Sequence, residues 1–136
     1  MYGKTYSLDH NPANCLDYDV NTGQVGMHTC QNVNRQQWTY DTRTSQLVNA
    51  NTSCGVNDCG FALCLSADGG GNGASVSLQT CDGGWVEKWN IAGQELVNRN
   101  SGLCLDDASH GGTGPLVVWN RNGQGQQNWY IVGYTT

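Results

Sequence analysis

The chain has 136 residues, the size of one domain, and only 12% of them are charged, while glycine reaches 19. Eleven acidic against six basic side chains give a net charge of -5, which argues against nucleic acid as a partner because that partner requires a basic surface. No apolar run approaches the ~20 residues of a membrane-spanning helix, so we expect no membrane insertion. No signal peptide is recognisable, and we expect Met1 to begin an expressed or excised segment.

Three landmarks recur in the same order along the chain. A Cys-Leu pair opens each unit, at Cys15, Cys64 and Cys104. A stretch of the type VGMHTC follows and ends at Cys30, Cys81 and Arg121. Eight residues later a Q-x-W-like tripeptide ends at Trp38, Trp89 and Trp129. The single domain 1–136 is therefore one unit written three times, with repeats of approximately 1–45, 46–94 and 95–136.

Short alternating runs predict β-strands in each repeat, at 25–28, 76–79 and 115–118. No helical period lasts for ten residues, and glycine-rich stretches such as 69–73 provide turns. The second repeat is longer because it carries an insertion around SCGVNDCGFA, which we interpret as a loop. Three units are too few for a propeller and lack the caps of an open solenoid, so we predict an all-β fold closed with threefold pseudosymmetry.

Seven cysteines in so short a chain indicate an oxidising compartment and hence a secreted, extracellular protein. The spacing predicts three disulfides, Cys15–Cys30, Cys64–Cys81 and Cys54–Cys59. Cys104 remains as a free thiol because Arg121 stands where its partner would be. A zinc site is the competing interpretation, but it fails because no CxxC occurs and the three histidines are scattered.

The order CLD, V-x-hydrophobic-x-x-C and Q-x-W, repeated three times, resembles ricin-B-type lectins and family-13 carbohydrate-binding modules over essentially the whole chain. The resemblance implies a β-trefoil of twelve strands, whose subdomains are called α, β and γ. It also implies non-catalytic binding of galactose-type glycans, xylan or another polysaccharide, with the three Q-x-W tryptophans in the core. Such modules often belong to secreted glycosidases or toxins, so a covalently linked catalytic domain in the parent protein is one expectation.

In this family the sugar contacts come from the Asp of CLD, an aromatic ring before the second landmark, a polar residue after it and the pair that opens Q-x-W. In the γ repeat these positions hold Asp106, Trp119, Asn122, Gln126 and Gln127. Carboxylate and amide groups match neighbouring hydroxyls, while an aromatic face covers the C–H patch of a sugar ring. Only Gln126 departs from the family pattern, which has Asn there, so we predict the main site in γ.

The other two repeats match less well. The corresponding α residues are Asp17, His28, Gln31, Asn34, Arg35 and Gln36. Histidine buries less area than tryptophan, and Arg35 replaces the usual Asn, so we predict a weaker α site. In β the same positions hold Ser66, Gln79, Val86 and Glu87, and we expect no binding there. Trp85 beside them either fills the vacant site or serves a different ligand.

Catalytic, metal and cofactor chemistry finds no support in the sequence. There are only two glutamates, and no pair of carboxylates is spaced for glycoside hydrolysis. Asp17-x-Asp19-x-Asn21 begins like a calcium loop but departs from the pattern at its glycine and its last ligand. We therefore expect no enzyme activity, no metal and no cofactor. The remaining alternative is a trefoil that binds protein, as a toxin subunit or an inhibitor.

Overall fold

The computed structural model describes residues 5–7, 14–19, 23–31, 33–50, 53–54, 57–58, 62–67, 69–108, 114–131 and 134–135. Within them the chain forms sixteen strands and three single-turn 3₁₀ helices, so the all-β prediction is confirmed. The strands are β1 (Thr5–Ser7), β2 (Asn14–Tyr18), β3 (Val25–Thr29), β4 (Trp38–Asp41), β5 (Gln46–Asn49), β6 (Ser53–Cys54), β7 (Asn57–Asp58), β8 (Leu63–Ser66), β9 (Ser77–Thr80), β10 (Trp89–Ala92), β11 (Glu95–Asn98), β12 (Cys104–Asp106), β13 (Gly114–Pro115), β14 (Val117–Trp119), β15 (Trp129–Ile131) and β16 (Tyr134–Thr135). The 3₁₀ helices are η1 (Asn34–Gln36), η2 (Trp85–Glu87) and η3 (Gly125–Gln127).

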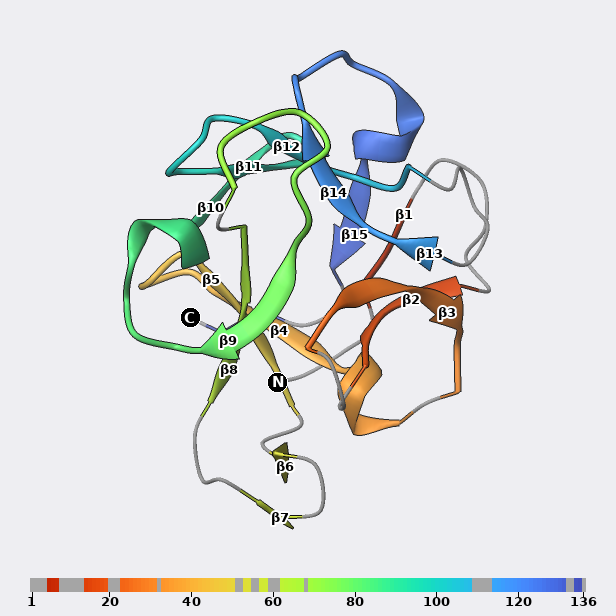
Figure 1. Ribbon diagram of the computed structural model, residues 1–136, viewed down its shortest axis with the longest axis vertical. Helices are drawn as coiled ribbons and strands as arrows, with labels where there is room; N and C mark the ends of the chain where they lie inside the picture. Colours follow the sequence, from red (N-terminus) through yellow and green to blue (C-terminus); the bar gives the residue numbers. More distant parts are fainter. Residues whose placement is uncertain are drawn as a thin grey trace.

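Equivalent hairpins from the three repeats surround a common centre. Figure 1 shows β2 and β3 at the right, β8 and β9 at the lower left, and β12 and β14 at the top. The strands pair in the same register in all three repeats. In each repeat, the Cys of the Cys-Leu pair lies opposite the position where the family has its sugar-stacking aromatic ring, which we call the platform position. These pairs are Cys15–His28, Cys64–Gln79 and Cys104–Trp119. The threefold pseudosymmetry predicted from the sequence is confirmed, and the fold is the β-trefoil that the family resemblance implied.

The repeats are also joined to one another in a threefold pattern. The joining residue pairs are Gln24–Ser77, Ser75–Val117 and Gly26–Pro115. Each repeat is therefore paired through its backbone with a neighbouring repeat, which protects strand edges that would otherwise face solvent.

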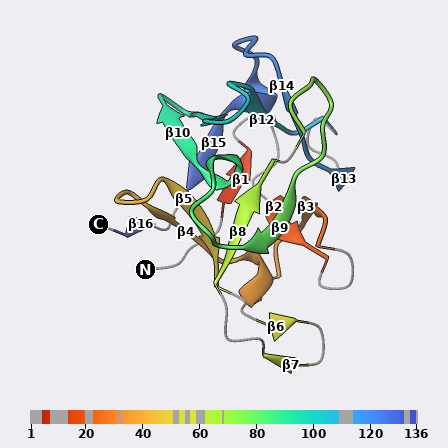
Figure 2. The same cartoon turned by 60° about the vertical axis from the view of Figure 1, so that its left-hand side comes forward.

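The structure has more strands than the twelve that the resemblance implied. The insertion of the second repeat carries its own hairpin, β6–β7, which stands away from the rest of the molecule in both views (Figures 1 and 2). In the third repeat, Leu116 separates two short strands, β13 and β14. The predicted Cys54–Cys59 bond lies outside the residues whose side chains the structure describes.

The Q-x-W tryptophans form equivalent parts of the core. Trp38 and Trp89 have no exposed surface and Trp129 is 4% exposed. Each indole N–H donates to the carbonyl oxygen of the leucine in its own Cys-Leu pair, at 2.9–3.0 Å. Burial of a ring of this size contributes roughly 4 kcal/mol, and the hydrogen bond fixes its orientation. The predicted structural role of these three residues is confirmed.

Two of the predicted disulfides are present, Cys15–Cys30 and Cys64–Cys81, each with a Cα–Cα distance of 5.1 Å. Cys104 is a buried free thiol, as predicted. Burial, with a smaller contribution from the nearby Glu95 carboxylate, raises the pKa of the Cys104 thiol to about 11. Arg121 instead forms an ion pair with Glu95, with Nε 2.5 Å from Oε1. In the described part of the chain, no helix is long and apolar enough to cross a membrane.

Candidate functional site

Two cavities open at equivalent places of the first and third repeats, and we call them the α cavity and the γ cavity. The α cavity, of about 450 Å³, is lined by Asp17, Tyr18, Asp19, His28, Thr29, Gln31 and Arg35. The γ cavity, of about 280 Å³, is lined by Gly73, Asp106, Ala108, Val117, Trp119, Asn122 and Gln126. In the first and third repeats, the structure thus brings together the predicted carboxylate, the residue at the predicted aromatic position and some of the predicted polar residues. Of the predicted residues, Asn34, Gln36 and Gln127 do not line these cavities.

Gln36 and Gln127 lie directly behind the cavities and are 1% and 0% exposed. Gln127 Nε2 donates to Asp106 Oδ2 at 3.0 Å and to the Asn120 carbonyl at 2.8 Å. Its Oε1 accepts the Asn122 amide N–H at 3.0 Å. One buried amide therefore holds both the carboxylate and the loop that follows the second landmark.

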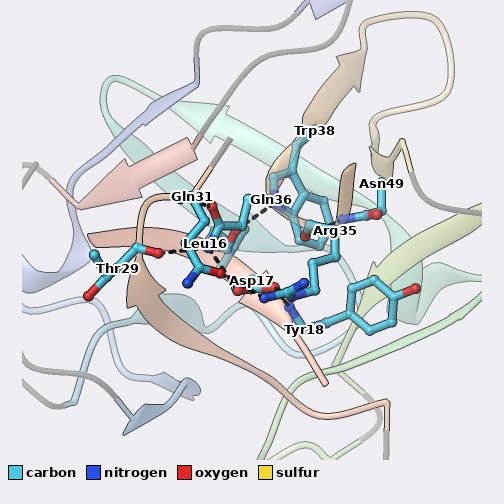
Figure 3. Close-up of polar contacts among 9 residues, drawn as sticks. All are labelled: Leu16, Asp17, Tyr18, Thr29, Gln31, Arg35, Gln36, Trp38 and Asn49. Atoms are coloured by element: carbon cyan, nitrogen blue, oxygen red, sulfur yellow. Dashed lines mark hydrogen bonds and ion pairs between the residues drawn. The ribbon is translucent and has the colours of Figure 1, made fainter. Parts of the chain in front are cut away.

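The α repeat reproduces this arrangement. Gln36 Nε2 donates to Asp17 Oδ2 at 2.9 Å and to the Thr29 carbonyl at 3.0 Å. Its Oε1 accepts the Gln31 amide N–H at 2.7 Å (Figure 3). The two repeats thus build the same support for the same carboxylate, although their other cavity residues differ.

In the α cavity the carboxylate also pairs with a cation from its own repeat. Arg35 Nε lies 3.0 Å from Asp17 Oδ1, and Arg35 Nη2 donates to Gln31 Oε1 at 3.0 Å (Figure 3). The Asp17 side chain is 2% exposed, whereas the Arg35 side chain is 37% exposed. The pairing therefore places a partly exposed cation over a buried carboxylate. The predicted neighbour Asn34 is exposed on η1.

The γ cavity combines a buried carboxylate with an exposed aromatic face. Asp106 is 5% exposed, while Trp119 is 43% exposed. At the rim, Asn122 Oδ1 accepts the Gln124 amide N–H at 3.0 Å, and Gln126 Nε2 donates to Gln124 Oε1 at 2.8 Å. This set offers a hydroxyl acceptor, an apolar surface and amides within one hollow.

A loop of the second repeat, residues 69–74, forms part of the γ cavity wall. Asn72 Oδ1 accepts the Asn120 amide N–H at 2.7 Å, and the Gly73 amide donates to the Val118 carbonyl at 2.8 Å. Gly73 has φ +84°, and a Cβ added there would lie 3.5 Å from Trp119 Cζ3. The glycine therefore allows the backbone to approach the edge of the indole. The sequence indicated only a turn here, because spacing within one repeat carries no signal for contacts with the next.

Other cavity residues were not predicted from the sequence as sugar contacts, although Asp19 was considered as part of a calcium loop. These residues are Tyr18, Asp19, Thr29, Ala108 and Val117. Asp19 and Ala108 occupy the same position in their repeats, two residues after the carboxylate. Comparison of the two repeats at that position is the signal that could have identified them.

In the second repeat, a different polar cluster takes the place of the carboxylate and the buried glutamine that supports it. Glu87 is 1% exposed, and its Oε1 accepts the amide N–H groups of Asp82 and Gly83 at 2.9 and 3.3 Å. Gln46 Nε2 also donates to Oε1, at 3.1 Å. Burial raises the pKa of the Glu87 carboxyl, and the nearby Asp82 charge adds to the increase. Ser66, at the carboxylate position, is fully buried and donates to the Cys64 carbonyl.

Trp85 does not fill the vacant position of the second repeat, because its side chain is 64% exposed on η2. Of its two interpretations from the sequence, the first is wrong. Among the described residues, no group of three or more His, Cys, Asp or Glu side chains is placed to hold a metal ion.

Comparison with known proteins matches residues 9–129 to the ricin-type beta-trefoil lectin domain. No curated protein sequence matches the chain. Among solved structures, the hemolytic lectin CEL-III is 25% identical with a TM-score of 0.72, and the alignment covers 97% of this chain but 30% of CEL-III. The agglutinin from Abrus precatorius is 20% identical with a TM-score of 0.74, covering 96% of this chain and 48% of the agglutinin.

A third similar structure is the beta-trefoil lectin of the Vibrio vulnificus hemolysin/cytolysin, with N-acetyl-D-lactosamine bound. It is 18% identical with a TM-score of 0.72, and the alignment covers 99% of this chain and 96% of that one. The chain therefore spans less than half of CEL-III and of the Abrus agglutinin, but nearly all of this lectin domain.

Proposed function

Because the chain belongs to the family of ricin-type β-trefoil lectin domains, we propose that it is a non-catalytic carbohydrate-binding module whose main site is the γ cavity. The observation that carries this proposal is the convergence of a buried carboxylate, Asp106, and an exposed indole, Trp119, in one cavity. The exposed Asn122 and the buried Gln126 complete its polar lining. Convergent polar groups beside an aromatic face are the usual composition of a sugar site.

Each γ residue has a distinct task in this proposal. Asp106 accepts hydrogen bonds from sugar hydroxyls, and Trp119 covers the C–H face of the ring. Gln127 fixes the carboxylate without reaching the ligand, because it is fully buried. A single sugar ring buries little area, so we expect a dissociation constant on the order of 0.1–1 mM.

The proposed ligand is a galactose-type glycan or a polysaccharide such as xylan. The N-acetyl-D-lactosamine bound to the Vibrio vulnificus lectin domain supports the first of these as a starting point for experiments. The α cavity is the proposed second and weaker site, since His28 stands at the platform position and Arg35 pairs with Asp17. Two unequal sites on one domain would favour a multivalent polysaccharide over its monosaccharide.

Isothermal titration calorimetry with galactose and N-acetylgalactosamine tests this proposal. Trp119→Ala should remove the apolar face, and Asp106→Ala should remove the acceptor, so each should abolish measurable γ binding. Circular dichroism melting verifies that both variants remain folded. If both variants keep the wild-type affinity and stoichiometry, the γ cavity is not the site.

We propose further that the domain is extracellular, since two disulfides require oxidising conditions to form. It spans only 30% of CEL-III, so a linked catalytic or toxin domain in the parent protein is part of the same proposal. The alternative, a trefoil that binds protein, is favoured by one observation, the exposed indole of Trp85. Trp85→Ala should leave sugar binding at γ unchanged. Loss of sugar binding in this variant would mean that η2, which carries Trp85, contributes to the sugar site.

A further inference from the structure

We infer that Arg35 acts as an internal ligand of Asp17 and determines how well the α cavity accepts neutral sugars. The inference rests on the proposed function and deepens it, because it names the residue that separates the two sites. It starts from a count of the hydrogen bonds that the Asp17 carboxylate accepts.

Asp17 already uses most of its acceptor capacity within the protein. An ionised carboxylate has about four acceptor positions. Oδ1 of Asp17 receives Arg35 Nε at 3.0 Å and the Tyr18 amide N–H at 2.7 Å. Oδ2 receives Gln36 Nε2 at 2.9 Å. One position remains, whereas two neighbouring sugar hydroxyls require two.

The contact between Arg35 and Asp17 is the strongest of these bonds because both groups are charged and the carboxylate is buried. The protein also holds Arg35 at two further points. Asn49 Nδ2 donates to the Arg35 carbonyl at 2.9 Å, and Gln31 accepts from the far side of the guanidinium. A sugar hydroxyl that approaches Oδ1 must therefore displace a cation whose position is already fixed.

The third repeat has a neutral residue, not a cation, at the position that corresponds to Arg35. Gln126, which corresponds to Arg35, is neutral, and its Nε2 donates to Gln124 Oε1. Cavity size does not explain a weaker α site, since the α cavity is the larger of the two. Besides the exchange of His28 for Trp119, the two sites thus differ in the charge of the residue at the Arg35 position.

A reciprocal exchange of the two residues tests the inference directly. Arg35→Gln is made in a Trp119→Ala background, where the γ site is silenced, and Gln126→Arg is made in the otherwise unchanged chain. Each variant is titrated with galactose and N-acetylgalactosamine. We expect Arg35→Gln to raise α affinity about tenfold, and Gln126→Arg to lower γ affinity by a similar factor. Gln126→Arg also provides a measurement if Arg35→Gln does not fold.

The outcomes separate the inference from the proposed function. If the unchanged chain binds at γ but neither exchange alters affinity, the inference is overturned and the function stands. If the unchanged chain binds nothing while Arg35→Gln binds at α, the inference stands and the γ assignment fails. Absence of binding by every variant overturns both.

Discussion

The second repeat shares one strand pairing with its two neighbours but differs from them at a buried polar junction, formed by the side chain two residues before the core tryptophan. In all three repeats, an oxygen of the residue two before the core tryptophan accepts the amide N–H of Gln31, Asp82 or Asn122. Only in α and γ does the same side chain also donate to a carboxylate. In β a glutamate stands there and has no donor to give. The acceptor is common to all three repeats, whereas the donor is present only in α and γ, the two repeats proposed to bind sugar. We therefore expect that a repeat can lose its site without losing its structure.

The largest effect is expected when the β junction is introduced into γ by Gln127→Glu. The new carboxylate would face Asp106 Oδ2, which Gln127 Nε2 approaches to 3.0 Å in the present structure. Two buried like charges should cost about 2–4 kcal/mol of unfolding free energy at neutral pH and remove γ binding. Urea denaturation and calorimetry measure the two effects.

The matched control is Gln124→Glu, which makes the same change of charge at an exposed neighbour. It should alter stability by less than about 0.5 kcal/mol. A Gln127→Glu variant that binds sugar like the unchanged chain would show that the amide donor is dispensable, and the comparison between the repeats would lose its basis.

The reverse change, Glu87→Gln, should stabilise the second repeat. The pKa of Glu87 is raised in the folded state, so its contribution to stability is complete below about pH 4.5 and is lost as the pH rises through the folded pKa. The amide keeps an acceptor for Asp82 and avoids this loss. We expect a gain of about 1 kcal/mol at pH 7 that disappears near pH 4. A gain that is independent of pH, measured by denaturation at both values, would contradict this account.

A smaller effect is expected at the contact between the second and third repeats. Asn72→Ala removes the acceptor for the Asn120 amide and loosens the loop beside Trp119. We expect γ affinity to fall about threefold to fivefold, equivalent to somewhat less than 1 kcal/mol, with the fold intact. Asn72→Asp keeps the acceptor and should restore affinity, whereas an equal loss in both variants would assign the effect to something other than this hydrogen bond.

The smallest effect is expected at Ser66, the β counterpart of Asp106. Ser66→Ala removes a hydrogen bond of 3.3 Å to the Cys64 carbonyl, which should cost at most about 1 kcal/mol of stability. Sugar binding should not change, because β has no carboxylate at that position. A change in stoichiometry on titration would mean that the second repeat does bind sugar.

Much of this architecture was predictable because it repeats. The Cys15–Cys30 and Cys64–Cys81 bonds and the free Cys104 follow from equivalent spacing. The core position of the three tryptophans follows from the family resemblance. The family resemblance, carried over position by position, predicted several of the side chains that line the two cavities. The Cys54–Cys59 bond remains a prediction.

The sequence did not predict which groups the polar side chains contact. Arg35 pairs with Asp17, and Asn72 reaches across to the third repeat. Spacing within a repeat specifies which positions are equivalent, but it does not specify which neighbouring group a long side chain meets, nor which loop of the next repeat covers a cavity. The sequence therefore shows which amino acids differ at equivalent positions of the repeats. The consequences of these differences depend on contacts that only the structure shows.

Cys104 can serve as a chemical probe of opening in the third repeat, because it is a buried free thiol. The thiol is fully buried and lies opposite Trp119 in the β12–β14 pair. With a pKa of about 11, only about one molecule in ten thousand carries the reactive thiolate at pH 7. Because the thiol is buried, we expect alkylation to require separation of these strands, so its rate should report how often the strand that carries Trp119 opens. A ligand that holds Trp119 in place should slow this alkylation, so mass spectrometry of a labelling time course can follow occupancy of this repeat alone.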